Sequence, residues 1–290
     1  MRAAIRDTEI YFDIEGAGLV PDGPVMREKP PAFLIHGGPG GEHGGFKPGF
    51  SPLAEQMQLV YFDHRGQGRS ARGDKQSYTL DNNVEDMEAL RRHLGCGPIV
   101  SIGTSYGGMV AQAHAARYPE AVSHLVLIVT ASHAGFNARA RQIVAERGTP
   151  EMQRVCAELW AGELDTEAKL RHYYDVMGPM YSVQYDPAAA AVARQRGILA
   201  PDALNMAFAP GGFLQSYDLR PELARITAPT LILAGRHDWI CAPEFSEEIH
   251  RLIPGSTLRI FEHSSHSIRA DEPAAMLAAI AGFVAGRADG

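Results

Sequence analysis

Short apolar runs alternate with helical patterns along much of this chain. Apolar runs of four to six residues cover 30–35, 58–62, 99–102 and 125–129, while 79–94 and 106–118 have helical patterns. Strands of this kind that alternate with helices indicate a parallel sheet covered on both faces. A polar and apolar alternation over 8–14 predicts one early antiparallel strand. The sequence therefore predicts an α/β fold with a mostly parallel sheet flanked by helices.

The alternation is interrupted over residues 132–217. This stretch is helical, charged and rich in Tyr and Met, and it contains no convincing strand. Strands at 229–234 and 257–261 and helices at 243–252 and 273–284 then resume the pattern. A short helix is expected at 51–57. We therefore expect an α/β core of residues 1–131 and 218–290, with an inserted helical cap at 132–217.

Composition excludes several classes of protein. The 290 residues carry a net charge of −7 and no basic run, which argues against a nucleic-acid partner. No segment approaches the ~18 consecutive apolar residues of a membrane helix, and the N-terminus lacks the apolar core of a signal peptide. The three cysteines are widely spaced, which argues against a zinc or disulfide framework and predicts no metal. These features predict a cytoplasmic protein.

One serine, Ser105, lies between two glycines in the pattern Gly103-x-Ser-x-Gly107, at the junction of a predicted strand and a predicted helix. Glycine and serine are common turn residues, so a simple turn is one interpretation. The other is a nucleophile on a tight strand-to-helix corner, where the helix N-terminus favours negative charge. A serine hydroxyl is a weak nucleophile, so this interpretation requires a base and an acid elsewhere in the chain.

Both partners are present in the required order. Asp238 directly follows the predicted strand 229–234, and His266 follows the predicted strand 257–261. Ligand sites of open α/β sheets lie at such carboxyl ends of strands. We predict Ser105 as nucleophile, His266 as base and Asp238 as the acid that orients it. The alternative base is His263, while His237 is expected to be a loop histidine. The alternative acids are Asp218 and Asp271, which are both expected to be helix caps or exposed charges.

The sequence also offers donors for the oxyanion of a tetrahedral intermediate. One is the backbone N–H of Tyr106, the residue after the serine, and the other comes from the glycine loop 36–40, with Gly38 as the candidate. A tight turn alone would also explain the loop. A phosphate-binding loop is disfavoured, because no Gly-Lys-Ser/Thr follows the glycines.

Together these motifs resemble one family. The motifs are His-Gly-Gly-Pro-Gly at 36–40, Asp-x-Arg-Gly-x-Gly-x-Ser at 63–70, Gly-x-Ser-x-Gly-Gly at 103–108, Gly-Arg-x-Asp at 235–238 and Ser-His at 265–266. In combination they are similar to those of the proline iminopeptidase branch of the α/β hydrolases. The resemblance implies the triad above, no metal or organic cofactor, and a helical cap. Many members carry tryptophan where this chain has Tyr106. The family also binds the free α-amino group of its substrate through acidic residues, chiefly in the cap.

Substrate-binding residues are harder to assign. Acidic candidates for the amino group are Glu42 in the glycine loop and Glu158 and Glu163 in the predicted cap, although solvated helix faces would also explain acids there. Tyr174 and Tyr181 are candidates to line a pocket for a proline ring, with ordinary packing of the cap as the alternative. We interpret 63–70 as a structural brace for the glycine loop, with a substrate contact by Arg65 as the alternative.

These observations predict a serine hydrolase acting by acyl transfer on a small molecule or short peptide. The resemblance favours a prolyl aminopeptidase that releases N-terminal proline. A small carboxylesterase, lactonase or amidase is the enzymatic alternative. A ligand receptor that keeps the fold without turnover is a remote one. The sequence indicates no oligomeric state.

Overall fold

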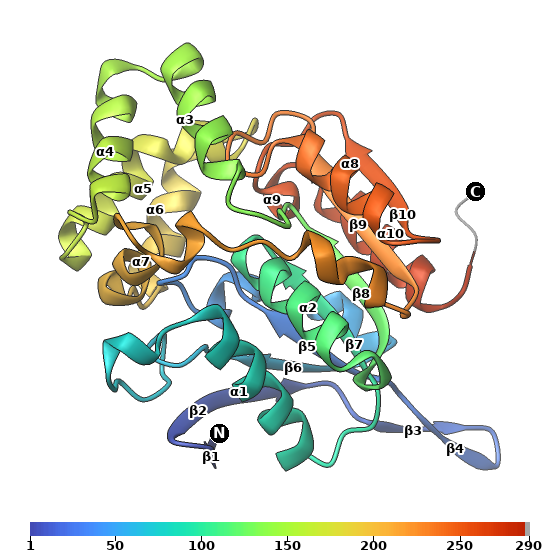
Figure 1. The fold of residues 1–290 in the computed structure, drawn as a ribbon. Helices are drawn as coiled ribbons and strands as arrows, with labels where there is room; N and C mark the ends of the chain where they lie inside the picture. The colour runs from blue at the N-terminus through green and yellow to red at the C-terminus, as the bar shows by residue number, and fades with distance from the viewer. Residues whose placement is uncertain (288–290) are drawn as a thin grey trace.

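The computed structural model describes residues 1–287. Its main sheet has eight strands: β1 (Arg2–Ile5), β2 (Thr8–Glu15), β5 (Pro31–Ile35), β6 (Gln58–Phe62), β7 (Ile99–Thr104), β8 (Val122–Ile128), β9 (Thr230–Gly235) and β10 (Thr257–Phe261). Their spatial order is β1-β2-β6-β5-β7-β8-β9-β10 (Figure 1). β2 runs antiparallel to both β1 and β6, and every other neighbouring pair is parallel. The predicted α/β fold with a mostly parallel sheet is confirmed.

The helices divide between the two faces of this sheet. Alternate side chains of β5 point to opposite faces, so that Phe33 and Ile35 join one apolar cluster and Ala32 and Leu34 the other. The first cluster includes side chains of α1 (Leu80–His93), α2 (Tyr106–Arg117) and α8 (Pro243–Leu252). The second includes those of α10 (Pro273–Val284) and of the 3₁₀ helix Ser51–Glu55. The central strands are therefore buried on both sides, as their continuous apolar character predicts.

Several predicted elements differ from the structure. The helix expected at 51–57 is a 3₁₀ helix, and the strand expected at 125–129 is β8, which starts three residues earlier and ends before Val129, a residue with φ 47°. β1 was not predicted because it is only four residues long. The hairpin of β3 (Leu19–Asp22) and β4 (Val25–Glu28) was also missed. Its side chains are mostly exposed, so it lacks the alternation that marks a strand packed on one face.

Between β8 and β9 the chain forms a group of helices that lies beyond the carboxyl ends of the strands (Figure 1). The two chain segments that connect the group to the sheet pair with each other: Leu219 N–H donates to the Ser132 carbonyl at 2.8 Å and Ala134 N–H donates to the Tyr217 carbonyl at 2.9 Å. The group comprises α3 (Phe136–Arg147), α4 (Pro150–Ala161), α5 (Glu167–Tyr181), α6 (Pro187–Arg196) and α7 (Pro201–Phe208). Its role as a separate cap stays a prediction.

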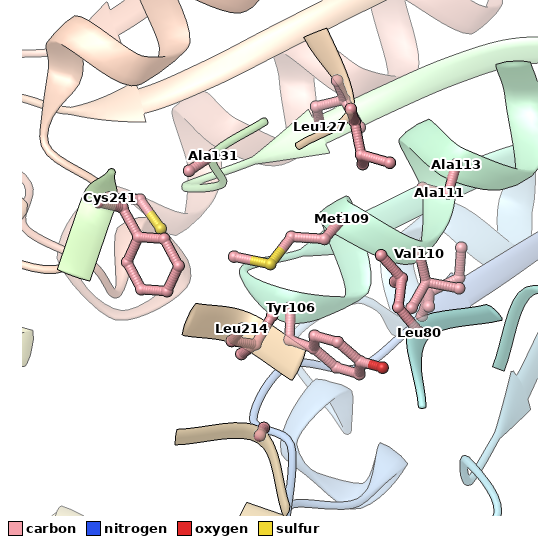
Figure 2. Close-up of a cluster of buried hydrophobic side chains, with 14 of the residues drawn as sticks. Leu80, Tyr106, Met109, Val110, Ala111, Ala113, Leu127, Ala131, Leu214 and Cys241 are labelled. Atoms are coloured by element: carbon pink, nitrogen blue, oxygen red, sulfur yellow. The ribbon is translucent and has the colours of Figure 1, made fainter. Parts of the chain in front are cut away.

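α2 connects the sheet to this group of helices. Figure 2 shows the Tyr106 ring at the start of α2 beside Leu214, which lies in the 3₁₀ helix Phe213–Gln215. The Tyr106 ring also lies 5.9 Å from that of Phe213. The residue after Ser105 is therefore held by the chain that returns from the helical group. In the described part of the chain, no helix is long and apolar enough to cross a membrane.

Candidate active site

Ser105 occupies a strained corner between β7 and α2. Its backbone has φ 55° and ψ −119°, a conformation that residues with a Cβ rarely adopt. Its backbone is bonded to the neighbouring strand and the turn after it: its N–H donates to the Ile128 carbonyl at 2.9 Å, and its carbonyl accepts from the Thr130 hydroxyl at 2.8 Å. The neighbouring strand β8 and the turn after it thus fix the corner on which the serine is presented.

The two glycines of the motif are explained by close backbone contacts. A Cβ on Gly107 would lie 1.9 Å from the Ile35 carbonyl oxygen at the end of β5, and one on Gly103 would lie 2.4 Å from the Gly107 carbonyl oxygen. Real Cβ atoms never approach so closely. Only glycine therefore lets α2 start this near to the sheet, which supports the nucleophile interpretation of the spacing over a simple turn.

The three residues predicted as a triad are brought together. His266 Nε2 lies 3.0 Å from Ser105 Oγ, and His266 Nδ1 lies 2.8 Å from Asp238 Oδ2. The second oxygen of Asp238 accepts the N–H groups of Ile240 at 2.8 Å and Cys241 at 3.1 Å. Since Asp238 is only 1% exposed, these donors stabilise a buried carboxylate. In the matching tautomer, Nδ1–H donates to Asp238 and Nε2 accepts the serine proton.

The alternative acids and bases lie elsewhere. His263 and His237 are both exposed, and Asp218 pairs with Arg220 at the surface, as expected. The expectation for Asp271 is wrong: it is neither a cap nor an exposed charge, but is buried at 5% exposure. Its carboxylate accepts hydrogen bonds from the helical group and from the turn that carries His266, which are distant in sequence and so invisible to a local pattern.

The glycine loop runs directly over the serine. A Cβ on Gly37 would lie 3.1 Å from Ser105 Cβ and 3.8 Å from Ser105 Oγ, and Gly38 has φ +122°, which favours glycine. The side-chain oxygen of Gln67 accepts the N–H of Gly40 at 2.7 Å and so ties the loop to segment 63–70. Within residues 1–287, the N–H groups of Gly38 and Tyr106 have no protein acceptor. They remain available to a substrate oxygen.

Two buried histidines, one at the start of this loop and one in segment 63–70, were not singled out from the sequence. His36 Nδ1–H donates to the Gly37 carbonyl at 2.8 Å, and His36 Nε2 accepts the backbone N–H of His64 at 3.2 Å. Burial lowers the pKa of both His36 and His64. Both rings are therefore neutral at pH 7, and their hydrogen bonds hold the start of the glycine loop.

Segment 63–70 has the contacts expected of a brace. Burial alone would raise the pKa of Asp63, but the hydrogen bond from the His43 ring and further donors lower it to about 2. Arg65 is 2% exposed and forms a bidentate pair with Asp86 at 2.6 and 2.7 Å and a bond to Asp7 at 2.9 Å. These partners occupy a guanidinium that is already buried, which disfavours a substrate contact by Arg65.

The acidic substrate-binding candidates are engaged away from the triad. Glu42 Oε2 accepts the Gly44 N–H and the Arg69 guanidinium, both at 2.9 Å. Glu158 pairs with Arg154 on the same helix, and Glu163 is exposed. None of these contacts reaches Ser105 or His266. Sequence spacing already places Arg154 four residues before Glu158, which is the signal of a helix-surface pair.

Glu42 also belongs to the one group in the described chain with metal-ligating spacing, which it forms with His43 and Asp63. The Asp63 carboxylate already accepts the backbone and ring N–H of His43, each at 2.8 Å, and the N–H of Arg69 at 2.7 Å. Protein donors therefore satisfy these oxygens. The group is explained as part of the brace that orders the glycine loop.

Of the two aromatic candidates, Tyr181 packs against His266, and Tyr174 packs against Tyr181. The Tyr181 ring lies edge-on to the His266 ring with centroids 5.7 Å apart, and it is also 5.7 Å from Trp239. The Tyr174 ring lies 5.9 Å from that of Tyr181. Tyr181 ends α5, so this cluster joins the helical group to the triad histidine. Trp239, next to Asp238, was not predicted as part of it.

Comparisons with known proteins agree with this arrangement. The sequence profile of the alpha/beta hydrolase fold matches residues 30–273. The chain is 30% identical over 269 residues to proline iminopeptidase PfmaB of Pestalotiopsis fici, covering 90% of this chain and 94% of that protein. It is 28% identical to the proline iminopeptidase of Saccharolobus solfataricus, over 86% of this chain and 83% of that protein.

Solved structures show the same fold. The proline iminopeptidase of Mycobacterium smegmatis superposes with a TM-score of 0.76 at 19% identity, covering 99% of this chain and 97% of that one. A thermophilic esterase from Thermogutta terrifontis superposes with a TM-score of 0.68 at 25% identity, covering 99% and 98%. The chain belongs to the alpha/beta hydrolase family and is similar to its proline iminopeptidases.

Proposed function

We propose that this enzyme is a serine hydrolase that works by acyl transfer, with Ser105 as nucleophile. The observation that carries the proposal is the unbroken chain of hydrogen bonds from Ser105 Oγ through both nitrogens of His266 to Asp238. These groups come from three different strand ends and meet at hydrogen-bonding distance on a strained corner. Such convergence is the geometric signature of nucleophilic catalysis by serine.

The reaction follows from these contacts. His266 Nε2 removes the Ser105 proton as Oγ attacks the substrate carbonyl carbon, while Asp238 holds the ring in the productive tautomer and stabilises the imidazolium. The imidazolium then gives its proton to the leaving amine or alcohol, and an acyl-enzyme remains. The same nitrogen then takes a proton from water as the water oxygen attacks the acyl carbon. The bond from that carbon to Ser105 Oγ breaks, the imidazolium returns the proton to Oγ, and the acid is released.

The N–H groups of Gly38 and Tyr106 are proposed as the donors to the oxyanion. Support comes from the Gly37 position, which brings the loop against Ser105, and from the place of Tyr106 as the first residue of α2. The N-terminus of that helix adds its partial positive charge. Loss of one such donor typically costs 100- to 1,000-fold in kcat, about 2.7–4 kcal/mol.

We further propose that the physiological substrate is a short peptide with N-terminal proline. The names of the relatives support this assignment. In this proposal residues 132–217 act as a cap over the site, and the rings of Tyr181 and Tyr174 line the position of the proline ring. The three free cysteines suit the reducing cytoplasm as the location of the enzyme.

A neutral ester is the second candidate substrate. The observation that favours it is that Glu42 and Glu158 are both paired with arginine, so neither is free to bind a substrate ammonium group. Under this alternative, the same triad cleaves a small ester or lactone that carries no α-amino group.

One paired assay tests both assignments. Proline β-naphthylamide, its N-acetylated form and a p-nitrophenyl acetate control are compared in the wild type and in Ser105→Ala. The prolyl aminopeptidase assignment predicts turnover of the free amine, little of the blocked form, and loss of nearly all activity in Ser105→Ala. Turnover of the acetate alone favours the ester assignment. Full activity in Ser105→Ala refutes the serine mechanism.

A further inference from the structure

The turn that carries His266 is tied to the helical group on both sides of the histidine. The Ser265 hydroxyl donates to the Met180 carbonyl at 2.6 Å, and the Ser267 N–H donates to the Tyr181 carbonyl at 2.9 Å. Met180 and Tyr181 are the last two residues of α5. The backbone around the proposed base is therefore anchored to α5, and not only to the sheet.

Asp271 adds further hydrogen bonds between the turn that carries His266 and the helical group. Its Oδ2 accepts the N–H of Ser265 at 2.9 Å, next to His266. Its Oδ1 accepts the Ser182 hydroxyl and the N–H of Gln184 at 3.2 Å. The Gln184 side-chain amide donates to the Asp271 carbonyl at 2.9 Å. One carboxylate thus joins the histidine turn to the segment that follows α5.

Burial of the Asp271 carboxylate has a free-energy cost. A carboxylate that is 5% exposed loses most of its hydration, and only its hydrogen-bond donors compensate for that loss. Two of those donors, from Ser182 and Gln184, come from the chain that follows α5. If the helical group moves away, the Asp271 carboxylate keeps only the Ser265 N–H. The turn then loses its bonds to the end of α5 and keeps those to His237 and Glu272.

We propose that Asp271 is a positioning residue for His266, and that Ser182, Gln184, Ser265 and Asp271 form a latch. The latch holds the base against Ser105 only while the helical group is docked on the sheet. Catalytic competence is thereby coupled to closure of the helices over the substrate. This inference rests on the proposed acyl-transfer function, because it assigns His266 the role of base.

The test is the variant Asp271→Asn, with Glu262→Gln as the matched control. Glu262 lies at the start of the same turn, but its pair with Arg236 is exposed. Both oxygens of Asp271 accept hydrogen bonds, but an asparagine side chain has only one oxygen. In Asp271→Asn the NH₂ group takes the place of the other oxygen and faces a donor. We expect Asp271→Asn to lower the rate of Ser105 labelling by a fluorophosphonate probe at least tenfold. We also expect it to lower kcat for p-nitrophenyl acetate tenfold with KM within twofold, and Glu262→Gln to match the wild type.

A spectroscopic readout separates positioning from folding. The Nδ1 proton of His266, bonded to Asp238, gives a far-downfield NMR resonance, which should shift or broaden in Asp271→Asn at unchanged secondary structure. If that variant does not fold, two variants replace it: Ser182→Ala removes a donor to the Asp271 carboxylate, and Gln184→Ala removes the amide bond to the Asp271 carbonyl. Each should lower kcat without raising KM.

The outcomes distinguish the latch from the proposed function. A wild-type enzyme that the probe does not label overturns the acyl-transfer function, and the latch with it. Wild-type labelling that persists at the same rate in Asp271→Asn, or in both replacement variants, overturns the latch alone.

Discussion

The strained backbone of Ser105 leads to a prediction about stability that is independent of turnover. Replacing the serine by glycine removes the Cβ that makes φ 55° and ψ −119° unfavourable, whereas replacement by alanine keeps it. Both variants lose the hydroxyl, so the hydrogen bond to His266 is absent from both. The difference in stability between Ser105→Gly and Ser105→Ala therefore reports the backbone strain without any contribution from that hydrogen bond.

The magnitude follows from two opposing contributions. A residue with a Cβ in such a conformation costs about 1–3 kcal/mol, which glycine recovers. Glycine also gives the unfolded chain more conformational freedom, which costs about 0.5–1 kcal/mol relative to alanine. We expect Ser105→Gly to be more stable than Ser105→Ala by about 1 kcal/mol, which corresponds to a rise of roughly 2–4 °C in Tm for a chain of this size.

Thermal unfolding followed by circular dichroism, together with urea titration, measures the difference. Ser123 in β8 provides the control, because its φ is not positive and glycine there should be less stable than alanine by about 0.5–1 kcal/mol. The opposite sign at the two serines is the expected result. A Ser105→Gly variant that is equal to or less stable than Ser105→Ala would refute the claim that the corner stores strain.

Three further predictions concern the surroundings of the triad. Arg65→Lys loses the buried bidentate pair and should reduce the free energy of unfolding, measured by urea titration, by about 1–3 kcal/mol. Its control, Arg69→Lys, changes a half-exposed pair and should reduce that free energy by less than about 1 kcal/mol. Equal losses in the two variants would contradict the structural role of segment 63–70. Gly107→Ala should lower stability by about 3 kcal/mol or more because its Cβ meets backbone, while Gly45→Ala, with open space around it, should stay within about 0.5 kcal/mol in thermal unfolding. Burial lowers the pKa of His36 and His64 in the folded protein, so below about pH 6.5 the unfolded chain binds more protons than the folded one. Their contribution to the free energy of unfolding is therefore fully present above that pH and is lost as the pH falls. The urea midpoint should drop between pH 7.5 and 5.5, and the drop should shrink in His64→Gln; an undiminished drop points to other groups.

The sequence allowed prediction of those features that local patterns encode. Continuous apolar runs precede Ser105 and Asp238, and a strand that includes Arg259 precedes His266. The order of these strand ends along the chain predicted that the three residues would converge. The helical pattern over 79–94 begins with Thr79, and the Thr79 hydroxyl accepts the Asn82 N–H at 3.2 Å as the cap of α1. Patterns of this kind describe a residue through its immediate neighbours.

The missed features depend on partners that are far away in sequence. Asp271 looks like any acid before a helix, and its burial follows from Ser182, 89 residues earlier. His36 and His64 lie 28 residues apart, and nothing local indicates that one accepts a hydrogen bond from the other. No pattern in a single sequence specifies such pairs.

The distance along the chain between nucleophile and base has a consequence for biosynthesis. Ser105 and His266 are separated by 161 residues, and β10, which precedes the histidine, is the edge strand of the sheet and the last to be translated. Under the proposed mechanism, a nascent chain contains its serine long before the base that activates it has been translated. Pairing of β10 on β9 is a non-local, late step of folding. Under the proposed mechanism, the hydrolase acquires its reactivity only when its last strand joins the sheet.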